Sequence, residues 1–137
     1  MEIKRLEELE KALKNFEDSL EIDLSKFPSF IKDVLESGQV QKFEMSYELF
    51  WKVGKELLAR LEGVDAGSPR RVFKSLFQLG YLTYEELEVC LSMLEDRNLL
   101  SHVYRREVVE SVLPKLKSYL NLMKSVSYRF REVLKSD

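Results

Sequence analysis

The residues best suited to chemistry lie in one short segment, residues 97–104. It holds Arg97, Asn98 and Ser101, then His102, the single histidine of the chain, and then Tyr104. An arginine can bind a phosphate through two parallel hydrogen bonds and stays charged at any working pH. A histidine can take or give a proton near neutrality. Together they could cleave RNA without a metal: the 2′-hydroxyl is deprotonated, attacks the adjacent phosphate and leaves a cyclic phosphate.

The spacing of these residues limits how they can act together. If the segment is one continuous helix, Arg97, Ser101 and Tyr104 share a face, while Asn98 and His102 form a neighbouring pair one turn apart. Arg97 and His102 then lie about 140° apart around the helix axis. They can act on one phosphate only if the helix breaks here or if a second subunit completes the site.

A structural interpretation also accounts for these side chains. Arg97 would pair with a nearby carboxylate such as Glu95 or Asp96, and His102 would stabilise a helix C-terminus. From these residues alone, this structural interpretation is favoured.

Other catalytic signatures are absent from the sequence. It has no Gly-rich phosphate loop, no His-Glu-x-x-His pair, no Cys-x-x-Cys and no Gly-x-Ser-x-Gly elbow. One cysteine and one histidine cannot build a zinc site from the usual ligands, so we expect neither a metal nor a cofactor. The cysteine, Cys90, lies in an apolar helical stretch, which indicates inert packing.

Length and composition indicate an ordinary globular protein. The chain has 137 residues, of which 45% are hydrophobic and 34% charged. This length suits a single domain over residues 1–137. No stretch approaches the roughly 18 apolar residues of a membrane span, and the N-terminus lacks the apolar region of a signal peptide. We therefore expect a soluble, cytoplasmic protein that does not enter a membrane.

The charges are unevenly distributed around a net charge of −2. Residues 1–66 carry ten Lys/Arg and fifteen Asp/Glu, whereas residues 67–137 carry twelve and nine. A basic C-terminal half could attract a phosphate-bearing ligand, although a solvated face is the more common explanation. Arg70 and Arg71, at a helix start, and Ser101 are candidates for binding phosphate or a partner carboxylate. For the two arginines, exposed surface positions are about as plausible.

Apolar residues recur every three or four positions almost throughout the chain, which is the period of an amphipathic helix. No useful stretch alternates with period two, so we predict an all-α fold, an antiparallel up-and-down bundle of four to five helices. Helices are predicted over residues 6–20, 40–61, 69–80, 83–94 and 109–133, with a short helical approach over residues 30–38.

Local signals set the expected helix boundaries. Ser68-Pro69 is a helix start, Gly80 is a helix end, and residues 83–86 form a capping box. A short helix is expected to end near Gly38. Gly54 lies on an apolar stripe, where the missing side chain would let another helix approach. Pro114 is expected to kink the last helix or to mark its first turn.

Four blocks of sequence occur in a fixed order: residues 41–52, 68–73, 91–98 and 101–104. An Arg-x4-His-x-Tyr string alone would arise by chance in many proteins, whereas four ordered blocks are specific. With them, the chain resembles the HepT-like branch of the HEPN superfamily, also called nucleotidyltransferase substrate-binding proteins. The flanking helices fit the helical bundle of that family.

The resemblance implies a function. Active members are metal-independent ribonuclease toxins of toxin–antitoxin modules, act as homodimers on RNA such as tRNA or mRNA, and join two copies of the motif across the interface. Their partner is an MNT-type nucleotidyltransferase antitoxin, which transfers AMP onto the motif tyrosine. Carried over here, Arg97 and His102 would be catalytic, Asn98 the polar residue after the arginine, and Tyr104 the site of AMPylation. The alternative is a non-catalytic substrate-binding subunit of a two-component nucleotidyltransferase.

Some neighbours of the motif have two interpretations. Glu44, Glu48 and Lys52 recur at four-residue steps, which is explained by surface ion pairs or, within a matching block, by a dimer or partner surface. Trp51 is interpreted as a core or interface residue rather than a platform for base stacking. Relatives often carry small hydroxyl side chains around the motif histidine. This chain has two apolar residues there instead, Leu100 and Val103.

Overall fold

The computed structural model describes residues 2–102 and 106–136, and within them the chain is helical without any strand. The all-α prediction is therefore confirmed. Three short turns join the longer helices: the 3₁₀ turns η1 (Leu24–Lys26) and η3 (Leu113–Lys115), and the π-helical turn η2 (Leu58–Glu62). The α-helices are α1 (Lys4–Leu20), α2 (Ser29–Leu57), α3 (Pro69–Gln78), α4 (Tyr84–His102), α5 (Arg106–Val112) and α6 (Leu116–Lys135).

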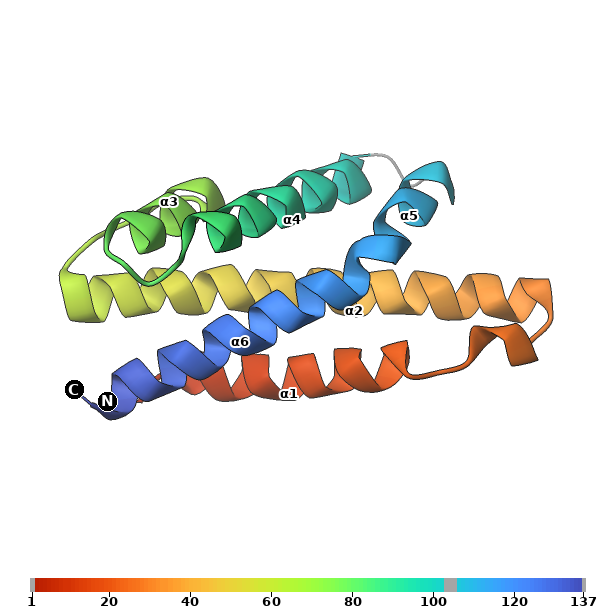
Figure 1. Cartoon of the computed structure of the whole chain (residues 1–137), viewed down its shortest axis with the longest axis horizontal. Helices are drawn as coiled ribbons and strands as arrows, with labels where there is room; N and C mark the ends of the chain where they lie inside the picture. Colours follow the sequence, from red (N-terminus) through yellow and green to blue (C-terminus); the bar gives the residue numbers. More distant parts are fainter. Residues whose placement is uncertain (1, 103–105, 137) are drawn as a thin grey trace.

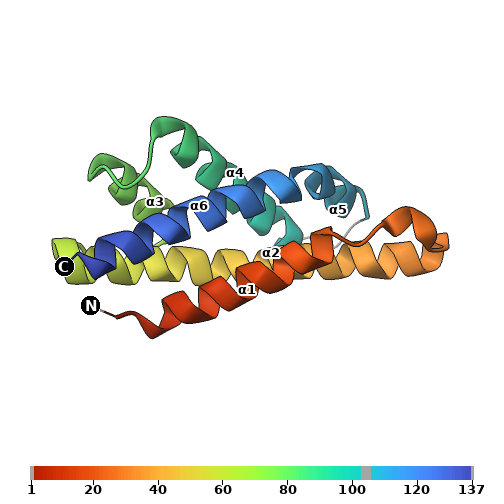
Figure 2. The same ribbon diagram turned by 60° about the horizontal axis from the view of Figure 1, so that its bottom comes forward.

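The four long helices alternate in direction along the bundle, as predicted (Figure 1). The longest helix, α2, runs the length of the molecule, with α1 antiparallel beside it and α6 packed against both. The short helix α3 packs on both α2 and α4, while α5 lies at the far end of α4. Both ends of the chain lie at the same end of the bundle (Figures 1 and 2).

Helix α2 is continuous through Gly38, so the prediction of a separate short helix ending there is wrong. Gly38 keeps a negative φ, and a glycine inside a helix costs only about 0.5–1 kcal/mol relative to alanine. The next residue, Gln39, donates a 2.8 Å hydrogen bond from Nε2 to the carbonyl of Ser19, which ties α2 to the end of α1. Phe30 and Val34, on which the shorter helix was predicted, are 71% and 66% exposed.

The predicted caps of α3 and α4 are present. Ser68 Oγ accepts a 3.3 Å hydrogen bond from the backbone N–H of Arg71. At the start of α4, the N–H of Glu86 donates to Thr83 Oγ1 at 3.2 Å, and the N–H of Thr83 donates to Glu86 Oε1 at 2.8 Å. Helix α3 ends before Gly80, whose φ of 88° is readily adopted only by glycine. These short-range signals correctly place the elements that precede the motif.

The predicted last helix is divided at Pro114. Helix α5 ends at Val112, the 3₁₀ turn η3 contains the proline, and α6 starts at Leu116. Proline has no N–H and its ring collides with the preceding turn, so the α-helical ladder cannot continue through it. The expected kink is thus an interruption of the α-helix at η3, with a bend between α5 and α6 (Figure 1).

The absence of a side chain at Gly54 lets α3 approach α2 closely, as the sequence predicted. A methyl group at this position would meet Val72 Cγ1 at 3.0 Å and Leu76 Cδ1 at 3.1 Å, both from α3. At Gly38, in the same helix, an added methyl group would meet nothing within 4 Å. The two glycines of α2 therefore differ in the space around them.

Substitution of these two glycines should shift stability in opposite directions. Gly54→Leu should lower the free energy of unfolding by about 1–3 kcal/mol, since the added atoms overpack the contact with α3. Gly38→Ala should raise it by about 0.5–1 kcal/mol, since alanine favours the helix and meets no obstacle. Urea unfolding followed by circular dichroism measures both. Equal effects of the two substitutions would contradict the packing described here.

Candidate functional site

Helix α4 carries the Arg-x4-His segment and is unbroken from Tyr84 to His102. Arg97 is partly buried, with 26% of its side chain exposed. Asn98, Ser101 and His102 are exposed at the C-terminal end of the helix. Because the helix does not break between Arg97 and His102, the two side chains project about 140° apart. Tyr104 lies outside the described residues.

Arg97 faces two carboxylates of α2. Its Nε lies 3.7 Å from Glu44 Oε2 and 3.5 Å from Glu48 Oε1. The expected pairing with Glu95 or Asp96 is wrong: Glu95 points to solvent, and Asp96 is buried against other partners. In the sequence, the one signal for these partners is the spacing of Glu44 and Glu48, which lie one turn apart in a matching block. That α2 lies opposite Arg97 is decided by tertiary packing.

Asp96 is 5% exposed and anchors α4 to the C-terminal part of the chain. Its Oδ2 accepts a 2.5 Å hydrogen bond from the hydroxyl of Tyr119 and lies 3.2 Å from Nζ of Lys115. The Tyr119 hydroxyl is also 2.6 Å from Ser92 Oγ. Burial, together with the hydrogen bond to Asp96, raises the pKa of Tyr119, so the phenol remains a donor. Asp96 contacts α6 and Arg97 faces α2, so these two residues together fix the rotation of α4 about its axis.

The carboxylates that face Arg97 differ in their surroundings. Burial raises the pKa of Glu44 above its ordinary value, although the charge of Arg97 acts in the opposite direction. Glu48 is held within its own helix: Oε2 accepts a 3.2 Å hydrogen bond from Trp51 Nε1 and lies 3.9 Å from Lys52 Nζ. The surface ion pair of Lys52 is therefore present. Trp51 is partly buried against the core.

The sequence also singled out Arg70, Arg71 and Ser101. The two arginines are exposed in the first turn of α3. The positive charges of Arg70 and Arg97 both act on the buried hydroxyl of Tyr47, whose pKa burial nevertheless raises. Phe73 of α3 contacts the ring of Tyr47, and Arg97 lies beside Glu48, so α3 and Arg97 lie near the same part of α2. Ser101 Oγ donates a 3.0 Å hydrogen bond to the carbonyl of Asn98.

Two apolar features near the segment have structural roles. Leu100 is only 7% exposed and packs in the core, so it does not form the surface around His102. Cys90 is fully buried, and burial raises the pKa of its thiol, which confirms the prediction of inert packing. Val103 lies outside the described residues.

Neither a metal site nor a membrane helix is found in the part of the chain that the structure describes. No three His, Cys, Asp or Glu side chains there converge to hold a metal ion. No helix among these residues combines the length and apolar character needed to cross a bilayer.

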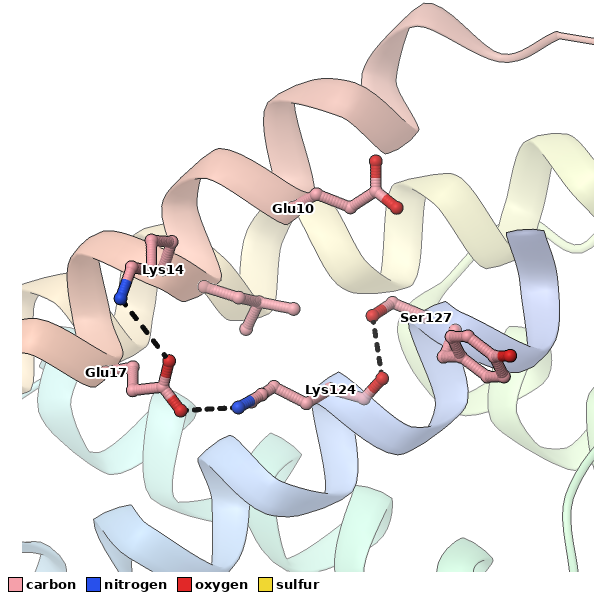
Figure 3. A pocket seen from close by; sticks show the side chains of 7 residues that line it. Glu10, Lys14, Glu17, Lys124 and Ser127 are labelled. Atoms are coloured by element: carbon pink, nitrogen blue, oxygen red, sulfur yellow. Dashed lines mark hydrogen bonds and ion pairs between the residues drawn. The ribbon is translucent and has the colours of Figure 1, made fainter. Parts of the chain in front are cut away.

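Figure 3 shows a groove between α1 and α6. Several of its polar side chains are already paired. Glu17 pairs with both Lys14, at 4.0 Å, and Lys124. Ser127 Oγ donates a 3.0 Å hydrogen bond to the carbonyl of Lys124. None of the residues 97–102 lines this groove, so α4 remains the candidate functional site.

An antiparallel helical bundle with an Arg-x4-His segment at the end of a long helix defines the class to which this protein belongs. The family described as nucleotidyltransferase substrate binding protein like matches residues 4–132. The chain belongs to this HepT-like family, which confirms the resemblance inferred from the four blocks.

Individual relatives agree with this assignment. A Haemophilus influenzae protein named "Probable ribonuclease HepT" is 26% identical over 97 residues, covering 68% of this chain and 65% of the relative. The crystal structure of a Thermus thermophilus protein has a TM-score of 0.79 at 31% identity, covering 90% of this chain and 98% of the other. A second solved structure, from Haemophilus influenzae and described as the fold of a substrate binding domain of a nucleotidyltransferase, has a TM-score of 0.79 at 23% identity, covering 92% of this chain and 98% of the other.

Removal of the Tyr119 hydroxyl tests the anchor behind Arg97. Tyr119→Phe should lower the free energy of unfolding by about 1–3 kcal/mol, because the buried Asp96 carboxylate loses one of its two hydrogen-bond donors and keeps only Lys115. Tyr128→Phe is the matched control, since Tyr128 lies in the same helix and is 68% exposed. The control should change stability by less than about 0.5 kcal/mol in the same urea titration. Equal stabilities of the two variants would argue against a stabilising role for the anchor.

Proposed function

We propose that this protein is a metal-independent endoribonuclease that acts as a homodimer and as the toxin of a toxin–antitoxin module. The observation that carries the proposal is the arrangement at the end of α4: Arg97 is held against α2, and His102 is exposed on the same unbroken helix. A relative named as a probable ribonuclease supports the same activity.

The geometry of α4 favours a site built from two protomers. Arg97 and His102 are separated by about 140° around one helix, so a single copy presents them in different directions. They could act on one phosphate if the helix broke between them or if a second subunit completed the site. Since the helix does not break, the second subunit is the remaining possibility. Two copies of α4 placed side by side would supply an arginine from one protomer and a histidine from the other.

The proposed reaction uses only protein side chains. His102 takes the proton of the RNA 2′-hydroxyl, and the resulting oxygen attacks the adjacent phosphorus. The bond from phosphorus to the 5′-oxygen breaks, that oxygen takes the proton that His102 had accepted, and a 2′,3′-cyclic phosphate remains on the other fragment. Arg97 binds the non-bridging phosphate oxygens and stabilises the charge that develops on them. Asn98 is exposed beside Arg97 and is available to bind the same phosphate.

The proposed antitoxin is an MNT-type nucleotidyltransferase that transfers AMP to Tyr104. The added phosphodiester would bring a negative charge and bulk to the Arg-x4-His-x-Tyr segment. It would compete with an RNA phosphate for Arg97, and cleavage would stop. Arg70 and Arg71, exposed at the start of α3, are proposed to contact the RNA backbone or a carboxylate of the partner.

A second candidate function is a non-catalytic subunit that binds substrate for a separate nucleotidyltransferase. The family description and the structural relative at 23% identity both refer to nucleotidyltransferase substrate binding. The net charge of −2 also supports this candidate, because it offers no broad attraction for RNA.

Cleavage of RNA by the purified, unmodified protein separates these candidates. The protein should cut tRNA or mRNA in excess EDTA and leave cyclic-phosphate ends. Arg97→Ala and His102→Ala should each reduce the rate at least about 100-fold, as expected for loss of a phosphate-binding or proton-transfer group. Arg60→Ala, which removes an exposed arginine paired with Glu56, should retain activity.

The same assay can support the alternative. A folded dimer that leaves RNA intact, with Tyr104 proved unmodified by mass spectrometry, would identify the protein as a binding subunit rather than a ribonuclease.

Transfer of AMP to Tyr104 is tested with a purified MNT-type nucleotidyltransferase. Incubation with that enzyme and ATP should add the mass of one adenylyl group per chain and should abolish cleavage. Tyr104→Phe should prevent the mass gain, because phenylalanine has no hydroxyl acceptor. An adenylyl group found on the Tyr104→Phe protein would place the modification elsewhere.

A further inference from the structure

The carboxylate of Glu48 in α2 is oriented by residues of its own helix. Its Oε2 accepts the 3.2 Å hydrogen bond from Trp51 Nε1 and lies near Nζ of Lys52. Both partners lie within about one turn of the same helix, so Glu48 is held locally. This arrangement leaves Oε1 as the oxygen that faces Arg97, 3.5 Å from Nε.

The guanidinium of Arg97 meets both carboxylates along one edge. Nε is buried and has no hydrogen bond to any described residue, whereas the side chain as a whole is 26% exposed. The accessible area therefore lies on other atoms of Arg97. A guanidinium has five N–H donors in a rigid fork, so contact along the Nε edge leaves donors for a phosphate.

We propose that Glu48, oriented by Trp51, is a positioning residue for Arg97, with Glu44 as the second carboxylate. This inference rests on the proposed ribonuclease function and identifies how that site is kept ready for RNA. A free arginine side chain samples many rotamers, and ordering it during the reaction would slow the chemical step. Carboxylates at the Nε edge order the side chain in advance.

The local charges are compatible with this role. Arg97, Lys52, Glu44 and Glu48 carry two positive and two negative charges when all are ionised, so the cluster as a whole is neutral. Of the two carboxylates, Glu48 is the nearer to Nε and the one held by an indole N–H. If the carboxylates instead screened Arg97 from RNA, their neutralisation would accelerate cleavage. If the carboxylates position Arg97, their neutralisation should instead slow cleavage.

Cleavage kinetics distinguish positioning from screening. Glu48→Gln should lower kcat about tenfold and change KM less, because the amide keeps the shape but loses the charge that holds Arg97. Trp51→Phe should lower kcat by a smaller factor, since it removes only the N–H donor. Glu56→Gln is the matched control: Glu56 lies in the same helix but pairs with Arg60 at 2.6 Å, and its substitution should leave kcat unchanged. In an Arg97→Ala background, Glu48→Gln should cause no further loss.

The Nε–Hε resonance of Arg97 supplies a readout that does not depend on activity. It is assigned by its disappearance in Arg97→Lys, and Glu48→Gln should shift it and speed its exchange with water. If the wild-type protein cleaves RNA, a Glu48→Gln variant that is as fast or faster overturns the positioning role. If the wild-type protein does not cleave RNA, the proposed function fails, and an unchanged Arg97 resonance in Glu48→Gln overturns the positioning role as well.

Discussion

Burial of one aromatic seam of α2 holds the bundle together. Phe43, Tyr47 and Phe50 recur at three- and four-residue steps and are at most 1% exposed. Their rings contact rings from three other helices, which no local interaction could bring together. These partners are Phe16 of α1, Phe73 of α3, and Tyr119 and Phe130 of α6.

The same seam determines where the functional side chains lie. Tyr119 stacks on Phe43 at a ring-centroid distance of 5.2 Å, and its hydroxyl bonds to Asp96. Asp96 precedes Arg97 in α4, so the hydrophobic core and the charged site are joined through one tyrosine. Glu44 and Glu48 follow Phe43 and Tyr47 in the sequence, which places a carboxylate pair beside the aromatic seam. Arg97 is thereby held between a core that fixes its helix and two carboxylates that face its side chain.

The unbroken helix α4 underlies the proposal of a site shared by two chains. His102 follows Arg97 by five positions, and this spacing turns the two side chains away from each other on α4. Such an arrangement is of little use to one chain acting alone, yet it allows two chains to combine an arginine and a histidine. Asn98, Ser101 and His102 are exposed at the C-terminal end of α4. The proposed toxin and substrate-binding functions both make use of that exposed end.

The sequence by itself determined the helical class, the caps at Ser68 and Thr83, the close approach at Gly54 and the four blocks that identify the family, because these features depend on short-range spacing and residue type. It did not show that α2 passes through Gly38, or how completely Pro114 divides the last helix. Only the tertiary structure decided that Arg97 faces α2 rather than its own neighbours. The rotation of α4 follows from contacts between residues far apart in the chain, and local periodicity carries no information about them.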